Sequence, residues 1–127
     1  MSLQPNPVNW FEIPVTDIQP AIMFYGEAFG IKLEPVEMGP NTFAFFPMEK
    51  GAAGAGGTLI QGQGSKPSQQ GTTVYFRVDS IDPVLDQIGK AGGKTLLPRG
   101  SVGQYGFIAH FEDSEGNRVA LHEAAKE

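Results

Sequence analysis

The sequence repeats itself at an interval of 63 residues, and this repeat limits the folds open to the chain. When the stretch 10–35 is shifted by 63 positions, it falls without a gap on the stretch 73–98, with eight identities in 26 positions. Two identities are prolines and two are glycines, the residues that most restrict or relax the backbone. The identical pairs are Val15 and Val78, Ile18 and Ile81, Pro20 and Pro83, Gly26 and Gly89, Ala28 and Ala91, Gly30 and Gly93, Leu33 and Leu96, and Pro35 and Pro98. The repeat predicts one supersecondary unit used twice.

The two units are expected to share one hydrophobic core. A unit of about 60 residues is marginally stable by itself, whereas 127 residues with 40% hydrophobic content suffice for one compact domain. We therefore expect a single domain over 1–127, with module one at about 7–62 and module two at about 71–123. The polar segment 62–71 (GQGSKPSQQG) between them is interpreted as a linker.

Each module is predicted to have the order β-α-β-β-β. In module one the pattern predicts strands over 8–15, 31–38, 42–48 and 58–61, with a helix for which Thr16 and Asp17 offer N-cap chemistry and which Gly30 ends. In module two it predicts strands over 72–78, 94–97, 107–111 and 118–123, with a helix that begins after Ser80 and is closed by Gly92 and Gly93. The predicted class is α+β, with two helices on one face of a curved, mostly antiparallel sheet.

Composition narrows the possible partners. The net charge is −5 and the basic residues do not cluster, which argues against nucleic acid and anionic membranes. Without cysteine the chain has no disulfide, no thiolate metal ligand and no cysteine nucleophile. The first residues lack the pattern of a signal peptide, and no apolar run approaches the length of a membrane span. We expect a cytoplasmic protein.

Motifs at both ends of the chain resemble a known superfamily. The paired modules are accompanied by a V-x-D strand end before a helix with F-Y and F-G, and by a final D-x-x-G-N-x-x-x-L turn and strand. The matching residues are Val15, Asp17, Phe24, Tyr25, Phe29, Gly30, Asp113, Gly116, Asn117 and Leu121. In these features the chain resembles the vicinal oxygen chelate superfamily, which includes glyoxalase I, bleomycin-resistance proteins and extradiol dioxygenases, and within it the glyoxalase-like group. The resemblance implies a U-shaped sheet around a cavity, a divalent metal held by His, Gln or Glu, and a homodimer.

The positions that hold the metal in this superfamily carry other residues here. The resemblance places them at Trp10, Thr73 and Ala120, with the fourth near Leu59. None of these side chains offers an imidazole or carboxylate. We therefore predict no metal and no cofactor, with one alternative: a divalent metal relocated to Glu12 and His122, on the same predicted wall as Tyr75 and Gln61.

The candidate site residues follow from the same positions. Trp10, Tyr75, Thr73, Ala120 and Tyr105 are expected to line the cavity, and Glu12 and His122 are the candidate catalytic residues. Simpler roles stay open: Glu12 in an ion pair with Arg77 or Arg118, Trp10 in core packing, and His122 at the surface. The facing of His110 is ambiguous, which makes it a lower candidate. The glycine-rich segment 51–57 is expected at the mouth of the cavity.

Three functions are compatible with this pattern. The first is binding of a small, partly aromatic organic molecule without a metal, for which acidic residues in the cavity would favour a cationic ligand. The second is an enzyme of lyase, isomerase or dioxygenase type that uses Glu12 and His122. The third is an interaction role with a cavity filled by side chains. The first is our prediction, because it needs none of the missing metal ligands.

Overall fold

The repeat becomes two matching halves, each with its own sheet and helix. The computed structural model describes residues 2–126. Module one contains β1 (Trp10–Pro14), α1 (Ile18–Phe29), β2 (Pro35–Met38), β3 (Asn41–Phe45) and β4 (Gly56–Gln61). Module two contains β5 (Tyr75–Arg77), α2 (Ile81–Lys90), β6 (Lys94–Ser101), the short 3-10 turn η1 (Gly103–Tyr105), β7 (Phe107–Glu112) and β8 (Arg118–Glu123). The predicted α+β class and the β-α-β-β-β order of each module are confirmed.

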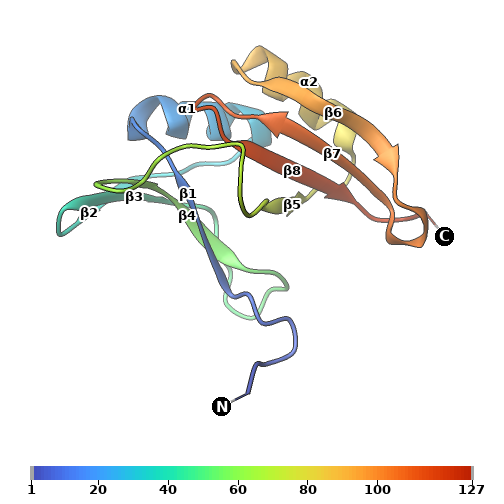
Figure 1. Ribbon diagram of the computed structural model, residues 1–127, viewed down its shortest axis with the longest axis horizontal. Helices are drawn as coiled ribbons and strands as arrows, with labels where there is room; N and C mark the ends of the chain where they lie inside the picture. The colour runs from blue at the N-terminus through green and yellow to red at the C-terminus, as the bar shows by residue number, and fades with distance from the viewer. Residues whose placement is uncertain (1, 127) are drawn as a thin grey trace.

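Each module forms a four-stranded sheet with the same topology. The strand orders are β1-β4-β3-β2 and β5-β8-β7-β6, in which the first strand of each module pairs in parallel with the last. The other neighbouring pairs are antiparallel. The edge strands β1 and β5 belong to different sheets. In Figure 1 the two sheets diverge from each other, and both helices lie along the top of the molecule.

The ends of α1 follow the predicted signals, whereas Ser80 precedes α2 without a side-chain cap hydrogen bond. The last strand of each module adds a further cap. The Asp17 carboxylate accepts from the backbone of Gln19 at 3.3 Å, and Gly30 ends α1 in the left-handed conformation, at φ 65°. The side chain of Gln61 also accepts a hydrogen bond from the first backbone N–H of α1, at 2.7 Å. In module two Glu123 does the same for α2, at 2.9 Å. The last strand of each module therefore caps the helix of that module.

An aromatic cluster joins the two modules. The ring of Phe76, on β5, lies 5.2 Å from the rings of Phe29 and Phe46 and 5.5 Å from that of Phe11, centroid to centroid. Phe11, Phe29 and Phe46 belong to module one, whereas Phe76 belongs to module two. Such ring pairs add about 0.5–1.5 kcal/mol each to the burial of their surface. This packing supports the expectation of a shared core.

The turn 113–117 also links the modules. Asp113 accepts a hydrogen bond from the buried Tyr25 hydroxyl of α1 at 2.6 Å, and Asn117 donates to the carbonyl of Pro14 in β1 at 2.7 Å. Glu115 accepts two more from Thr16. Residues 88 to 103 positions apart are thereby joined by hydrogen bonds. Among residues 2–126 no helix is long and apolar enough to cross a membrane.

Candidate functional site

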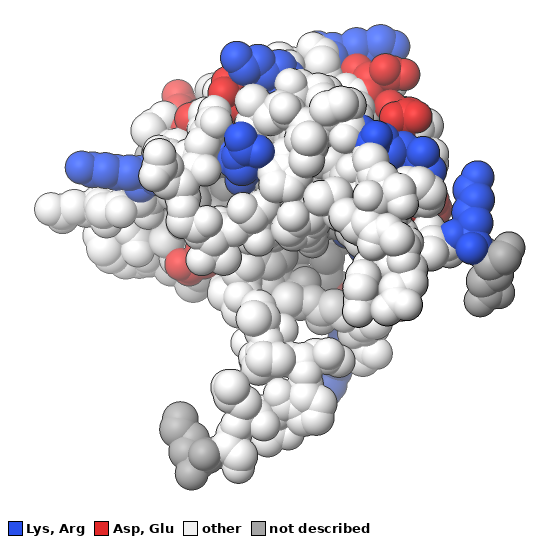
Figure 2. All heavy atoms as spheres, turned by 45° about the vertical axis from the view of Figure 1, so that its right-hand side comes forward, with Lys and Arg blue, Asp and Glu red and all other residues white. Residues whose placement is uncertain are grey.

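A pocket of about 1150 Å³ lies where the edge strands β1 and β5 face each other. It is open to solvent on one side, and Figure 2 shows a hollow in the centre of the molecule, surrounded mostly by uncharged residues. The wall consists of β1, β5 and the end of α1, together with the loop residues 53–55. The glycine-rich segment expected at the cavity mouth thus contributes to the pocket wall.

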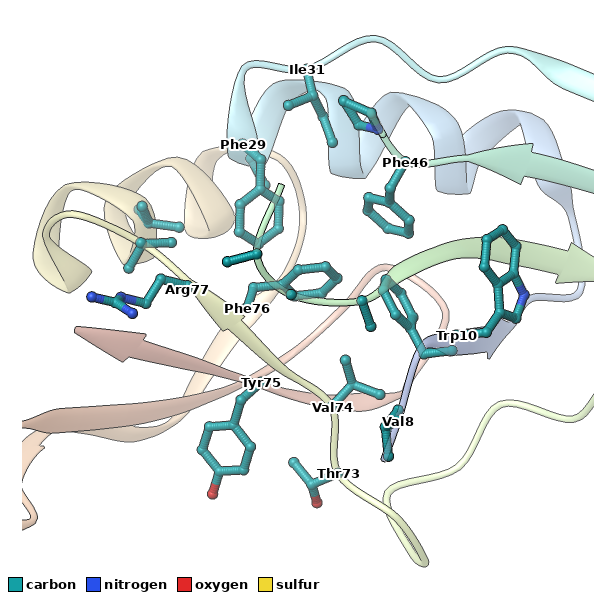
Figure 3. A pocket seen from close by; sticks show the side chains of 18 of the residues that line it. Val8, Trp10, Phe29, Ile31, Phe46, Thr73, Val74, Tyr75, Phe76 and Arg77 are labelled. Atoms are coloured by element: carbon teal, nitrogen blue, oxygen red, sulfur yellow. The ribbon is translucent and has the colours of Figure 1, made fainter. Parts of the chain in front are cut away.

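The inner part of this pocket is aromatic. Phe11, Phe29, Phe46 and Phe76 all line it, and Figure 3 shows the last three directed toward one another. These are the rings that join the two modules. Because the joining cluster also forms the inner wall, the shape of the pocket depends on how the modules pack. Apolar walls of this kind favour ligands with rings or other apolar surface.

Polar side chains occupy the β5 wall and the opposite edge. Tyr75 and Arg77 lie at alternate positions of β5 and share one face of the strand, Thr73 lies two residues before β5, and Glu12 comes from β1. Asp79 follows β5 at the inner end. The charged residues that line the pocket are therefore of both signs. This mixture does not select the cationic ligand expected from acidic residues alone.

Four of the seven predicted site residues line this pocket. They are Trp10, Glu12, Thr73 and Tyr75. Trp10 is 41% exposed and lies edge-on to Phe45, with 6.0 Å between ring centroids. Trp10 lies on β1 and Tyr75 on β5, at opposite sides of the pocket in Figure 3, so they do not form one continuous aromatic wall.

The other three predicted residues lie outside the pocket lining. Ala120 is fully buried in the middle of the second sheet, between Tyr75 and His110. His122 contacts the carbonyl oxygen of Tyr105 through Nε2 at 2.6 Å, and the Tyr105 side chain is 70% exposed. The candidate acid–base pair is therefore divided, with Glu12 in the pocket and His122 on the other sheet.

The ion-pair role that stays open for Glu12 is not found among residues 2–126. The ion pairs there are Lys32 with Glu34 and Arg99 with Glu123, so Glu12 is not paired with Arg77 or Arg118. The prediction that Gln61 shares a wall with Glu12 is wrong, because the Gln61 side chain caps α1. The physical reason is the strand register: Gln61 lies on the core side of β4, like Leu59, which is fully buried.

The structure reveals a polar cluster that the sequence alone did not assemble. Tyr75 Oη lies 3.0 Å from His110 Nε2, and Arg118 Nη1 lies 2.9 Å from His110 Nδ1. The three residues come from β5, β7 and β8, and the strand register brings Tyr75 and His110 next to Ala120 on one face. Burial, and then the nearby Arg118 charge, lower the pKa of His110. The alternation of strand residues was the available signal, but it does not give the pairing between strands.

The residues at the superfamily's metal positions do not fit a metal ion. Trp10, Thr73 and Ala120 have no imidazole or carboxylate group. The strand register places Thr58, not Leu59, beside Glu12 on the face opposite the core. The Thr58 hydroxyl is buried without a hydrogen-bond partner. Within residues 2–126 no group of three or more His, Asp or Glu side chains could hold a metal ion. A hydroxyl beside a single carboxylate is a weak donor set for a divalent metal.

Comparison with known proteins gives a consistent family. The model described as "Glyoxalase/Bleomycin resistance protein/Dioxygenase superfamily" matches residues 8–121. A glyoxylase-like domain-containing protein of Didymella fabae is 30% identical over 118 residues, which cover 90% of this chain and 91% of that protein. The putative glyoxylase CFP32 of Mycobacterium tuberculosis is 28% identical over 120 residues, 91% of this chain and 45% of CFP32. The chain thus spans about half the length of CFP32.

Solved structures share the fold. TnmS3, an antibiotic binding protein from Streptomyces sp. CB03234, has a TM-score of 0.72 to this chain, at 23% identity over 98% of this chain and 99% of TnmS3. Glyoxalase I from Zea mays has a TM-score of 0.69 at 23% identity, over 92% of this chain and 46% of that enzyme. At these identities the likeness is one of fold.

Proposed function

The chain belongs to the glyoxalase/bleomycin resistance protein/dioxygenase superfamily, and from this premise we propose that it binds a small, largely apolar organic molecule between β1 and β5 without a metal ion. The observation that carries the proposal is the pocket itself. Its volume, about 1150 Å³, is slightly above the usual range of about 300–1000 Å³ for small-molecule sites. Its inner wall is aromatic, and Glu12, Thr73, Tyr75, Arg77 and Asp79 add polar groups to the lining; small-molecule sites usually combine an apolar wall with polar groups that orient the ligand.

Two further observations support binding over catalysis. The proposed acid–base partners Glu12 and His122 do not line one pocket, and the residues at the metal positions lack imidazole and carboxylate groups. In addition, the fold is compatible with ligand binding, since TnmS3 is described as an antibiotic binding protein. An enzyme that uses Glu12 and His122 has no comparable support.

The single tryptophan makes the proposal testable. Trp10 lines the pocket and is partly exposed, so a bound aromatic molecule should change its fluorescence. We expect a panel of two- and three-ring aromatic compounds to include saturable binders, measured by tryptophan fluorescence and by calorimetry. Treatment with a chelator should leave their affinity unchanged. Binding that appears only after addition of a divalent metal would overturn the proposal.

A blocking substitution with a matched control places the binding in the pocket. Thr73→Phe puts a ring at the pocket wall and should weaken binding. Gln104→Phe adds the same ring at an exposed position of η1 that does not line the pocket, and should not. Equal affinities of the two variants for a compound that binds the unmodified protein would place its site elsewhere.

We further propose that two copies of the chain associate. The face of the first sheet opposite the core carries exposed apolar side chains, among them Trp10 (41% exposed), Val36 (42%) and Met38 (47%). Relatives such as CFP32 are about twice as long, so a second copy would supply an equivalent length of chain. Light scattering coupled to size exclusion should give twice the monomer mass. Val36→Glu should then shift the mass to that of a monomer, whereas a monomer for the unmodified protein would refute the proposal.

A further inference from the structure

The hydrogen bonds of the Tyr75–His110–Arg118 cluster have a fixed direction, which follows from which atoms can donate a proton. The guanidinium of Arg118 has only donors. Its Nη1 lies 2.9 Å from His110 Nδ1, so Nδ1 is the acceptor of that hydrogen bond and carries no proton. A neutral imidazole has one N–H, and the proton of His110 must therefore be on Nε2. Arg118 thus fixes the tautomer of His110.

The fixed tautomer determines the direction of the next hydrogen bond. His110 Nε2–H donates to Tyr75 Oη, at 3.0 Å, with the two rings nearly perpendicular, at 86°. The phenol oxygen of Tyr75 is then an acceptor in this pair, and its own hydrogen cannot point toward His110. It points away, to solvent or to a bound molecule. Hydrogen bonds arranged head to tail in this way strengthen one another.

Tyr75 is one of the residues that line the pocket. Tyr75 is 47% exposed and lines the cavity, and in Figure 3 its hydroxyl lies on the same side of the chain as that of Thr73. Arg77, two residues further along β5, lines the same pocket. The pocket lining thus has donors at positions 73, 75 and 77 on one side of this segment and the Phe76 ring on the other side. A ligand that contacts both sides would combine apolar rings with a hydrogen-bond acceptor.

We propose that Arg118 and His110 hold Tyr75 as a hydrogen-bond donor to an acceptor oxygen of the ligand, so that the pocket prefers a ring compound with a carbonyl or phenolate oxygen over the hydrocarbon of the same shape. Tyr75 is the contact residue, and His110 and Arg118 are positioning residues. This inference rests on the proposed function for its ligand, but the state of His110 can be measured without one.

The groups around His110 are consistent with a neutral ring. Tyr75 faces it from β5 and Arg118 from β8, while Leu97 is its neighbour on β6. Two further titratable residues share this face of the sheet. Glu112 lies two residues after His110 on β7 and pairs with Arg118, and His122 lies two residues after Ala120, the β8 neighbour of His110. Arg118 is thus the charged group in direct contact with the ring.

The first experiment measures the tautomer in the ligand-free protein. Long-range ¹H–¹⁵N correlation spectra distinguish Nδ1–H from Nε2–H, and the signals of the two histidines can be assigned with His122→Gln. We expect His110 as the neutral Nε2–H form at pH 7, and Arg118→Met should raise the pH at which it gains its second proton. A Nδ1–H tautomer, or a doubly protonated ring at pH 7, would overturn the inference whatever the protein binds.

The second experiment measures the preference for an oxygen. The probes are 9-fluorenone, which has one carbonyl, and fluorene, the corresponding hydrocarbon. One neutral hydrogen bond gives a preference of about threefold to tenfold. Tyr75→Phe and His110→Leu should remove this preference, His110→Gln should restore part of it because an amide can accept and donate in the same order, and Tyr105→Phe is the control outside the pocket lining.

The outcomes separate the two proposals. If neither probe nor any compound of the aromatic panel binds, the proposed function fails, and the tautomer still decides whether the cluster is arranged as inferred. If both probes bind but Tyr75→Phe keeps the preference for fluorenone, the pocket binds ligands and the donor role of Tyr75 is refuted.

Discussion

Replacing Asn117 with alanine should lower the free energy of unfolding by about 2–4 kcal/mol. The side chain is 4% exposed and makes three hydrogen bonds. Its amide donates to the carbonyl of Pro14 at 2.7 Å and to the carboxylate of Asp113 at 3.1 Å, and its oxygen accepts from the backbone of Ser68 at 2.9 Å. A hydrogen bond contributes about 1 kcal/mol, and a buried partner left without one costs about 1–3 kcal/mol.

Urea denaturation followed by circular dichroism measures this loss. The midpoint should fall while the slope stays the same, because the surface exposed on unfolding does not change. Asn9→Ala, an asparagine at an exposed position in the N-terminal segment, is the control and should alter the stability by less than about 0.5 kcal/mol. A loss below about 1 kcal/mol for Asn117→Ala would refute the reasoning that this turn fixes module two to module one. Two separate transitions in the unmodified protein would refute the shared core itself.

Two further predictions concern the helix cap of module two and the packing of β4. Hydrogen bonds from Arg99, and then from the backbone of Ile81, lower the pKa of Glu123 to about 2. Because this pKa is below the ordinary 4.5, ionised Glu123 stabilises the folded state fully above about pH 5. That stabilisation is lost as the pH falls toward 2. The stability difference between the unmodified protein and Glu123→Gln should therefore shrink from pH 6 to pH 3 in urea titrations, and a difference that stays constant would contradict this. Gly57→Ala should destabilise the protein by about 1–3 kcal/mol in thermal or urea unfolding, since a Cβ there would lie 2.4 Å from the Phe11 ring. Gly89→Ala in α2, with nothing within 4 Å of the added carbon, should be neutral or stabilising by up to about 1 kcal/mol, and equal losses for both variants would show that packing is not the cause.

Much of the fold could be predicted because its signals are local. Asp17 and Gly30 carry the cap chemistry of α1 in their own side chain or backbone freedom, and the structure confirms both helix ends. Strand limits were less accurate. The segment 72–78 was predicted as a strand, but β5 covers only Tyr75–Arg77. The predicted strand 94–97 continues to Ser101 as β6, through register irregularities that depend on its partner β7.

The site could be predicted only in part, because it depends on pairing between distant strands. Alternation along β1 and β5 predicts Glu12 and Tyr75 on one wall, and both residues line the pocket. The facing of Leu59 and Gln61 required the register of β4, since a shift of one residue reverses the side of the sheet. The facing of His110 is ambiguous in the sequence for the same reason, because its contact with Tyr75 spans 35 residues and its contact with Arg118 depends on the pairing of β7 with β8.

The sequence by itself determined the repeated module and the α+β class, because both follow from residue identity and spacing; that Trp10, Thr73 and Ala120 occupy the superfamily's metal positions is what the resemblance implies. Tertiary structure alone decided that Glu12 and His122 are separated, that the turn 113–117 fixes one module to the other, and that Arg118, His110 and Tyr75 meet beside the pocket. The physical reason is that hydrogen-bond partners and pocket walls are set by strand register and by the packing of the two modules, which a linear pattern does not specify.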